Sequence, residues 1–479
     1  MSITLNDTIA ALATPPGLGG MAVLRVSGPT AWTIAHALTR PPTLVGGQQG
    51  GISNRAHTTP PSPPAEAEGR DLANSARFAR IIKDGELVDE VVVTLYKGPH
   101  SYTGEDVAEI SCHGGRYAAT RILELVFEHG ARPARPGEFT ERAFLNNKLD
   151  LAQAEAVASL IHARTARAGI AAARQLAGGL SEKVKTMRSR LLDLLSLLEL
   201  ELDFSEEDVE FQARTERLSI VRELQAELKV LSATFRQGRL VREGIRVSLV
   251  GAPNAGKSTL LNALIGEERA IVSPEPGTTR DVVEAHIELD GIEVILQDTA
   301  GVRVATGTIE SEGIARTRRS IENADIILLV VDETSPHWPE ADTLSLLIKR
   351  SIILVQNKID LRTHTEPAEL AAPGQIAPIA FRAVSALTGQ GIHELRHDLV
   401  ALVIGEDIGN EEIVVAEARH HEALLKADES LRRSMAQLAE PTLMAADLRD
   451  AVDALGEITG ETVSEDVLDR IFSKFCIGK

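Results

Sequence analysis

Cysteine and aromatic residues are scarce in this chain of 479 residues, which has two Cys and only 3% Phe, Trp and Tyr. The two thiols, Cys112 and Cys476, are too few for a disulfide framework, so the composition favours a reducing, cytoplasmic compartment. The sequence also lacks a run of about 18 apolar residues and a basic, then apolar, N-terminal stretch. These absences argue against a membrane span and against export.

Excess positive charge is absent as well, because 50 Lys and Arg face 69 Asp and Glu, for a formal net charge of −19. A chain that coats nucleic acid non-specifically needs many cations aimed at phosphates, so this class is excluded. Local groups of arginines keep two interpretations, a solvated helix face and a contact for RNA. They are Arg132, Arg135, Arg142, Arg164, Arg167, Arg174, Arg316, Arg318 and Arg319.

The chain is long enough for about three domains. Residues 1–145 mix short strand-like runs such as MAVLRVSG with one helical run, which predicts a small α+β domain, and the Pro-rich stretch 41–69 predicts a surface loop within it. Helical patterns cover 146–243 and 403–479. Neither block completes a bundle alone, so we expect one discontinuous helical domain interrupted by an inserted domain, 244–402.

The inserted domain alternates strands and helices. Its strand-like runs, among them IRVSLVG, ADIILLVVD and SIILVQNKID, are nearly continuous in apolar residues. Such strands suit a sheet that is covered on both faces. The sequence therefore predicts a Ras-like α/β fold that binds a nucleotide.

A P-loop follows the first of these strands, because GAPNAGKS matches G-x-x-x-x-G-K-[ST]. Backbone N–H groups of such a loop cradle phosphates, Lys257 neutralises the β and γ oxygens, and the Ser258 hydroxyl ligates Mg²⁺. Thr279 in PGTTRD is spaced to reach Mg²⁺ and the γ-phosphate, and Asp298 in DTAG lies on the Mg²⁺ side. The P-loop alone also fits ATP.

The NKID motif decides the base, because Asp360 accepts hydrogen bonds from guanine N1 and N2 and so selects GTP. The main-chain N–H groups of the SAL motif would donate hydrogen bonds to the guanine O6. The predicted GTP site comprises Asn254, Ala255, Gly256, Lys257, Ser258, Thr259, Ser273, Thr278, Thr279, Asp298, Thr299, Ala300, Gly301, Asn357, Lys358, Asp360, Ser385 and Ala386. One position departs from well-known GTPases, because Val302 stands where a Gln orients the attacking water.

The flanks of the inserted domain are more specific than its GTPase motifs. ATPPGLGGMAVLRVSG, YTGEDVAEISCHGG, RPGEFTERAFLNNKLDLAQAEA and the terminal FCIGK closely resemble the MnmE (TrmE) family of tRNA-modifying GTPases, over almost the whole chain. The resemblance implies a homodimer, formed through the N-terminal domain, that hydrolyses GTP to GDP and phosphate. With the flavoprotein MnmG, which brings the FAD, it would add an aminomethyl or carboxymethylaminomethyl group to C5 of the wobble uridine of certain tRNAs.

The resemblance also implies cofactor sites. A 5-formyl- or methylene-tetrahydrofolate would lie in the N-terminal domain against Arg25, Glu109, Lys148 and Lys479, charged groups that suit an amide-rich pterin and a carboxylate tail. K⁺ would replace an arginine finger, and Glu310 would position the water that Val302 cannot orient. The implied K⁺ ligands are Asn254, Ser273, Glu275 and Thr278.

Two alternatives stay open. Cys476 is either a buried structural thiol or a reactive thiol near the folate site, whereas Gly478 and Lys479 do not suit a prenylation box. The alternative function is a ribosome-assembly or RNA-chaperone GTPase, which acts as a switch without chemistry on RNA. That class generally appends an RNA-binding module, whereas here the N-terminal domain carries the folate-type motifs.

Overall fold

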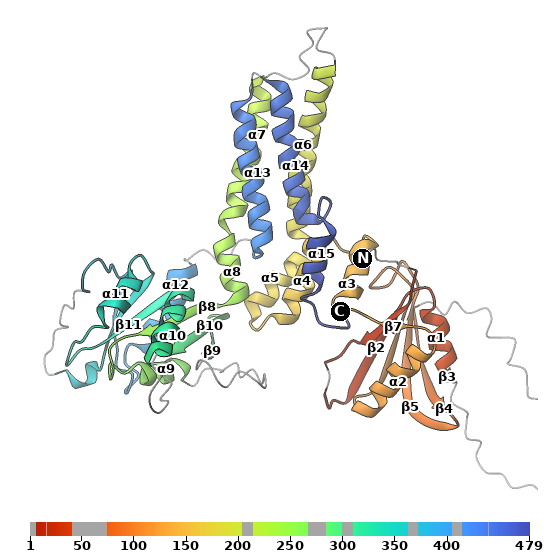
Figure 1. Ribbon diagram of the computed structural model, residues 1–479, viewed down its shortest axis with the longest axis horizontal. Helices are drawn as coiled ribbons and strands as arrows, with labels where there is room; N and C mark the ends of the chain where they lie inside the picture. The colour runs from red at the N-terminus through yellow and green to blue at the C-terminus, as the bar shows by residue number, and fades with distance from the viewer. Residues whose placement is uncertain are drawn as a thin grey trace, which may run out of the picture. The chain divides into compact units, whose positions relative to one another are not determined.

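The computed structural model describes residues 6–15, 17–40, 74–203, 214–266, 284–298, 310–362, 372–404, 414–438 and 440–479. The chain folds into two compact units, one of residues 1–155 with 463–479 and the other of residues 156–462 (Figure 1). The helical patterns predict that all of 403–479 belongs to the helical domain. The structure instead assigns its last part, 463–479, to the N-terminal unit.

The N-terminal unit is built on a seven-stranded sheet with the order β3-β4-β5-β6-β2-β1-β7. Its strands are β1 (Ile9–Leu12), β2 (Met21–Ser27), β3 (Thr39–Arg40), β4 (Ser75–Lys83), β5 (Glu86–Tyr96), β6 (Val107–His113) and β7 (Arg132–Pro133). Only the β1–β7 pair is parallel among these described strands. Alternate side chains such as Leu24 and Ile110 are buried beneath α1 (Ala31–Leu38) and α2 (Arg116–Glu128), as the period of two in these strands predicts.

Aromatic packing explains why the last segment belongs to this unit. Helix α15 (Glu465–Phe472) ends in Phe472, whose ring lies 6.3 Å from that of Phe144 in α3 (Glu138–Leu145) and 5.6 Å from that of Phe475. Gly137 allows this approach, because a Cβ there would lie 2.5 Å from the carbonyl oxygen of Phe472. Two buried phenylalanines thus anchor residues 463–479.

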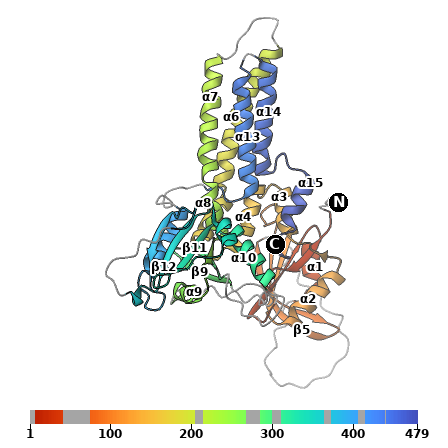
Figure 2. The ribbon, with the colours of Figure 1, turned by 60° about the vertical axis from the view of Figure 1, so that its left-hand side comes forward.

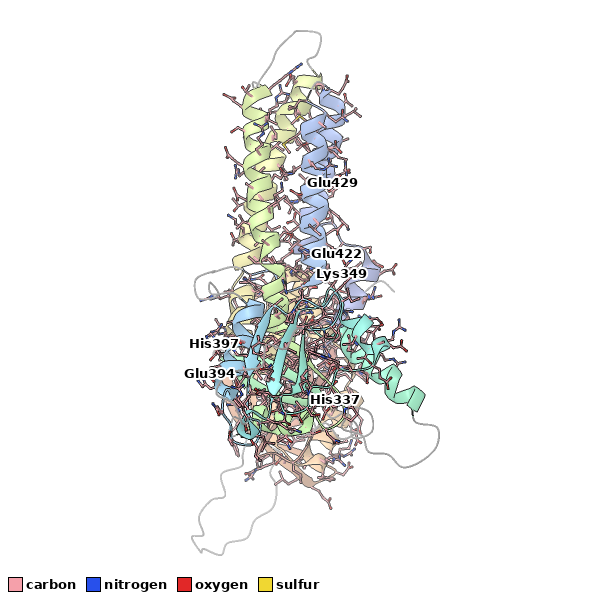
Figure 3. The ribbon with its side chains drawn as sticks, turned by 90° about the vertical axis from the view of Figure 1, so that its left-hand side faces the viewer. His337, Lys349, Glu394, His397, Glu422 and Glu429 are labelled. Atoms are coloured by element: carbon pink, nitrogen blue, oxygen red, sulfur yellow. The ribbon has the colours of Figure 1, made fainter. Side chains whose placement is uncertain are left out.

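In its described part, the second unit contains seven helices on the two sides of an α/β region. They are α4 (Leu151–His162), which begins in the first unit, α5 (Ala166–Leu176), α6 (Gly179–Asp203), α7 (Arg214–Ala233), α8 (Phe235–Glu243), α13 (Ala418–Ala436) and α14 (Pro441–Thr459). The four long helices α6, α7, α13 and α14 lie side by side (Figures 1 and 2). On α13, Glu422 and Glu429 lie two turns apart on one exposed face (Figure 3). Helical segments from both sides of the α/β region therefore share one bundle.

The described residues of the α/β region form a six-stranded sheet with the order β13-β12-β11-β8-β10-β9, and among these strands only β9 is antiparallel to its neighbour. The strands are β8 (Ile245–Val250), β9 (Glu284–Leu289), β10 (Ile292–Asp298), β11 (Ile326–Asp332), β12 (Ile352–Asn357) and β13 (Ala380–Ala383). Helices α9 (Lys257–Ile265) and α12 (Ile392–Ile404) pack on one face. Helices α10 (Glu310–Asn323) and α11 (Ala341–Leu347) pack on the other. The predicted strands therefore form a sheet that is covered on both faces.

In the described part of the chain, no helix combines the length and the apolar character that crossing a membrane requires.

Candidate functional site

The P-loop connects the end of β8 to the start of α9, and two glycines hold it against the rest of the domain. A Cβ on Gly251 would lie 2.3 Å from the carbonyl oxygen of Val330, and one on Gly256 would lie 2.2 Å from the Asn357 amide nitrogen. Gly256 also has φ +94°, which disfavours a side chain. Both glycines of the motif are therefore required by close approach of the backbone. Asn254 lies exposed between them with φ 65°.

Lys257 and Ser258 begin helix α9 directly after this loop. The ammonium of Lys257 donates to the carbonyls of Gly251 and Ala252, both at 2.9 Å, so it lies across its own loop. Burial lowers the pKa of Lys257, and the Asp298 carboxylate partly offsets that effect. The Ser258 hydroxyl donates to Oδ2 of Asp298 at 2.8 Å. The two oxygens lie close enough together to bind one ion, and Mg²⁺ prefers oxygen ligands.

The base-reading motif is connected to the P-loop by one buried amide. Asn357 donates from Nδ2 to the Ala255 carbonyl and accepts from the Ala386 N–H at Oδ1, both at 3.0 Å. The Ser385 hydroxyl donates to Oδ1 of Asp360 at 2.6 Å. Three predicted segments, far apart in the chain, therefore form one continuous site at the carboxyl ends of the parallel strands, where ligands bind in such sheets.

The described residues include only part of the predicted switch residues. The structure shows Thr259 exposed in the first turn of α9. Glu310 is the first residue of α10, and its side chain lies outside the described residues. The other predicted residues outside the described ranges are Ser273, Glu275, Thr278, Thr279, Thr299, Ala300, Gly301 and Val302. Their roles stay predictions.

In the N-terminal unit, the structure brings together two of the four predicted folate residues. Arg25 on β2 is the register partner of Glu109 on β6. Its guanidinium donates to Oε1 of Glu109 from Nε at 2.9 Å, and Nη2 lies at the same distance. The guanidinium also lies 5.0 Å from the ring centre of Tyr102 and 5.7 Å from that of Phe139. A charged pair beside two aromatic rings fits a flat heterocycle with polar edges.

The two predicted lysines belong to the same unit but not to this pair. Lys148 lies beside the loop at Gly104, where an added Cβ would be 3.3 Å from its Cγ. The residue before Lys479, Gly478, packs against the main chain of Leu12, which would lie 2.2 Å from an added Cβ. Among the described residues, no hydrogen bond or ion pair joins either lysine to Arg25 or Glu109.

Comparisons with known proteins identify the family of the chain. The family model "GTP-binding protein TrmE N-terminus" matches residues 8–148, and "MnmE helical domain" matches residues 151–476. The "tRNA modification GTPase MnmE" of Moorella thermoacetica is 44% identical, over 99% of this chain and 100% of that protein. The protein of the same name from Chlorobium chlorochromatii is 42% identical, over 99% and 98%. The chain belongs to the MnmE (TrmE) family.

A structural comparison adds little to this assignment. The G domain of the FeoB iron transporter of T. maritima is 29% identical and covers 33% of this chain and 96% of that one, with a TM-score of 0.24. A score this low supports no conclusion.

The two thiols of this MnmE family member lie in different environments. Cys112 is buried in the core of the N-terminal sheet, and burial raises its pKa to about 11, with a smaller contribution from Asp89. Cys476 is exposed, so the interpretation of this residue as a buried structural thiol is wrong. Exposure leaves the reactive-thiol interpretation.

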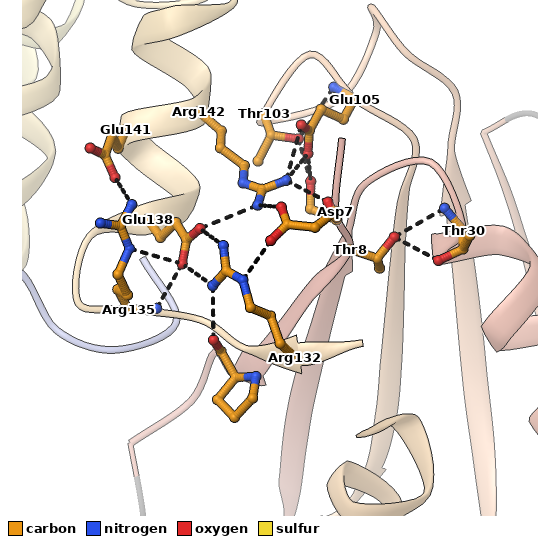
Figure 4. A network of polar contacts seen from close by, with 12 residues as sticks. Asp7, Thr8, Thr30, Thr103, Glu105, Arg132, Arg135, Glu138, Glu141 and Arg142 are labelled. Carbon is orange, nitrogen blue, oxygen red and sulfur yellow. Dashed lines mark hydrogen bonds and ion pairs between the residues drawn. The ribbon is translucent and has the colours of Figure 1, made fainter. Parts of the chain in front are cut away.

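One arginine group that we considered for RNA contact is instead engaged in an ion network (Figure 4). Arg132 and Arg142 both pair with Asp7 and Glu138, and Arg135 pairs with Glu138. Arg142 and Glu138 are fully buried. Burial alone raises the pKa of Glu138. Hydrogen bonds from Arg132 and from the Arg135 main chain outweigh this effect and hold the pKa at about 2. This network therefore stabilises the fold of the N-terminal unit.

Arg164, from the second arginine group, is also paired. Its Nη1 donates to Oε1 of Glu293 on β10 at 3.0 Å, and His286 lies 2.8 Å from the same oxygen. The Arg164 guanidinium is therefore already hydrogen-bonded to a carboxylate of the protein. Arg164, in the connection between α4 and α5, therefore joins that connection to β10 of the same unit.

Sequence patterns did not predict one series of side-chain hydrogen bonds, which lies next to Asp298 of the candidate Mg²⁺ site. The Ser320 hydroxyl of α10 donates to Gln297 at 2.8 Å and lies 2.8 Å from the hydroxyl of Ser248 on β8. Gln297 directly precedes Asp298, so this series of bonds connects the helix after the switch to the strand that carries the predicted metal carboxylate. The available signal was the polar residues Ser248 and Gln297 within strands that are mostly apolar.

Proposed function

We propose that this chain, a tRNA modification GTPase by family, couples hydrolysis of GTP to GDP and phosphate to modification of C5 of the wobble uridine, together with the flavoprotein MnmG. The product would carry an aminomethyl or carboxymethylaminomethyl group. The observation that supports this best is the single site in which Asn357 joins the P-loop to the guanine-reading residues.

Each described residue has a physical role in this GTP site. Lys257 can exchange the Gly251 and Ala252 carbonyls for phosphate oxygens, which gives stronger, charge-assisted hydrogen bonds. Asp360, oriented by the Ser385 hydroxyl, accepts from guanine. Ser258 and Asp298 would hold Mg²⁺, directly or through water, and the bound ion would neutralise charge on the β and γ oxygens. We assign Thr279 the remaining protein contact to the ion.

A monovalent cation would complete the catalytic charge. Val302 cannot orient water, and we propose that K⁺ takes the place of an arginine finger, with Asn254 as its side-chain ligand. The exposed position of Asn254 in the P-loop supports this role. Glu310 would position the water. The change Asn254→Ala should therefore remove the preference for KCl over NaCl in the hydrolysis rate, whereas equal wild-type rates in the two salts would refute the proposal.

The N-terminal unit would supply the one-carbon unit as 5-formyl- or methylene-tetrahydrofolate. The Glu109 carboxylate and the Arg25 guanidinium offer an acceptor and donors to a pterin edge, beside the Tyr102 and Phe139 rings. Lys148 and Lys479 would bind the carboxylate tail. FAD would reach the complex only through MnmG.

The same proposal includes the assembly. Two copies would dimerise through the N-terminal unit and form a hetero-oligomer with MnmG that binds tRNA in the cytoplasm. A chain that lacks residues 1–145 should then sediment as a monomer without nucleotide.

The decisive experiment is mass spectrometry of tRNA nucleosides from a deletion strain. Loss of the modified wobble uridine, restored by the wild-type gene but not by the Asp360→Ala variant, is expected. Unchanged wobble uridine in the deletion strain would favour the alternative, a ribosome-assembly GTPase.

A further inference from the structure

Two adjacent carboxylates, on the last residue of β11 and on the residue after it, lie beside the guanine-reading loop and outside the nucleotide-binding motifs. The first, Asp332, accepts from the Lys358 ammonium at Oδ2, at 2.6 Å. Its other oxygen, Oδ1, accepts from the Thr334 hydroxyl at 2.7 Å and from the Thr334 N–H at 2.9 Å. Burial alone raises the pKa of Asp332, but the bonds from Lys358 and Thr334 lower it below the ordinary value. The carboxylate is therefore ionised and held at both oxygens.

The second carboxylate, Glu333, binds the other end of the same loop. Its side chain is 6% exposed and accepts two parallel hydrogen bonds from Arg362, from Nε at 2.6 Å and from Nη2 at 2.8 Å. A bidentate pair of this kind fixes direction as well as distance. The Glu333 N–H also donates to the Asn357 carbonyl at 3.0 Å. Asp332, the last residue of β11, and Glu333, the residue after it, thus hold segment 358–362 at its first and last residues.

The segment has a backbone reason to need such support. Lys358 has φ 68°, a left-handed conformation that costs a non-glycine residue on the order of 1–3 kcal/mol. A single 3₁₀ turn, η2 (Ile359–Leu361), follows directly and contains Asp360. The Ser385 hydroxyl orients the Asp360 carboxylate, but it does not determine the path of the main chain. A bond from the Ile359 N–H to the Val384 carbonyl, at 3.3 Å, holds the middle of the turn, and Asp332 and Glu333 restrain its two ends.

We propose that Asp332 and Glu333 are positioning residues for base recognition: through Lys358 and Arg362 they clamp both ends of segment 358–362 and so aim Asp360 at the guanine. This inference rests on the proposed binding of guanine nucleotides by Asp360. The clamp touches neither the P-loop carbonyls that bind Lys257 nor the Ser258–Asp298 pair. Loosening it should therefore affect recognition of the base and leave recognition of the phosphates intact.

The experiment compares GDP with IDP, whose hypoxanthine lacks the 2-amino group that Asp360 would bind. Dissociation constants of both nucleotides are measured by calorimetry on the full chain with Mg²⁺. The first test variant, Asp332→Asn, keeps the shape of the side chain and removes the charge opposite Lys358. The second, Arg362→Gln, loosens the other end of segment 358–362 and replaces a residue that is more exposed than its partner Glu333. Two independent variants keep the test valid if one of them fails to fold.

The matched control is Asp325→Asn. Asp325 directly precedes the same strand, β11, at its opposite end, and is likewise paired with an arginine, Arg239, at 2.7 Å. A general loss of domain stability would appear in this variant too. As a rescue, Glu333→Arg should lower the preference for GDP, and the exchanged pair Glu333→Arg with Arg362→Glu should restore it.

We expect the ratio of IDP to GDP dissociation constants to fall roughly tenfold in the test variants, the scale of one misplaced hydrogen bond to a charged group. It should not fall in Asp325→Asn. An unchanged ratio in a folded test variant overturns the clamp, whether or not both affinities drop together. If the wild-type chain itself does not prefer GDP to IDP, the proposed guanine recognition fails first, which separates the two conclusions.

Discussion

Substitution of Glu138 by Gln should destabilise the N-terminal unit by about 3 kcal/mol at pH 7. Glu138 is fully buried and its pKa lies at about 2, compared with an ordinary value of 4.5. Each pKa unit corresponds to about 1.4 kcal/mol, so ionisation of this carboxylate contributes on the order of 3 kcal/mol. Removing one partner of a buried ion pair costs about the same. Gln keeps the shape but loses the charge that Arg132 and Arg142 bind.

The pH dependence has a definite sign. Because the pKa is lower in the folded state, the stabilisation is complete above 4.5 and is lost as the pH falls towards 2. The Gln variant has no such group. The difference in unfolding free energy between the two proteins should therefore shrink to roughly half by pH 3.

Urea unfolding followed by tryptophan fluorescence can report on this unit alone. The chain has two Trp, and Trp338→Phe leaves Trp32, whose indole donates to the Tyr96 and Val107 carbonyls within the N-terminal unit. With an m-value of about 2 kcal/mol/M, the midpoint should fall by about 1.5 M at pH 7.

The matched control is Glu124→Gln at the exposed pair with Arg121, where we expect less than about 0.5 kcal/mol. Equal midpoints for Glu138→Gln and its parent at pH 7 would refute the reasoning. So would a difference that does not change with pH.

Three further measurements test the sites. Glu310→Ala should lower kcat by roughly 10²-fold or more, the scale of one preorganised catalytic group, with GTP affinity kept; a fully active variant would remove Glu310 from the mechanism. Lys148→Ala should weaken binding of 5-formyl-tetrahydrofolate by about 1–3 kcal/mol in calorimetry without altering GTP affinity, and equal titrations would reject that assignment. Ellman's reagent at pH 8 should modify exposed Cys476 quickly and buried Cys112, with its pKa of about 11, only after unfolding; two fast thiols would contradict this.

Sequence patterns predict most directly those parts of the candidate site whose chemistry depends on closely spaced residues. The P-loop and NKID each place several ligand groups within a few positions, so the geometry of each follows from one short segment after a strand. The strands of the α/β region were predictable because apolar runs bounded by turns indicate a sheet covered on both faces. Arg25 and Glu109 were predicted through a resemblance, and the register of β2 and β6 then placed them side by side.

Contacts between distant segments were not predictable. In the sequence, Arg132 and Arg142 are compatible with a solvated helix face. Their pairs with Asp7, which is more than 100 residues away, form only in the folded chain. Likewise, nothing in the pattern of the last helix distinguishes packing on the bundle from packing on α3, a choice that the contact between Phe472 and Phe144 decides. Amphipathic periodicity predicts that a face is buried, but not which partner buries it.

The packing of α15 on α3 has a consequence for synthesis on the ribosome. Residues 463–479 close the N-terminal unit, yet all of 156–462 is translated between its two parts. At about 5–20 residues per second, that interval lasts on the order of 15–60 s. During this time the nascent N-terminal unit must keep the surface around Phe144 uncovered while the whole second unit emerges. The unit that would bind folate can therefore be completed only after the unit that would bind GTP has been made.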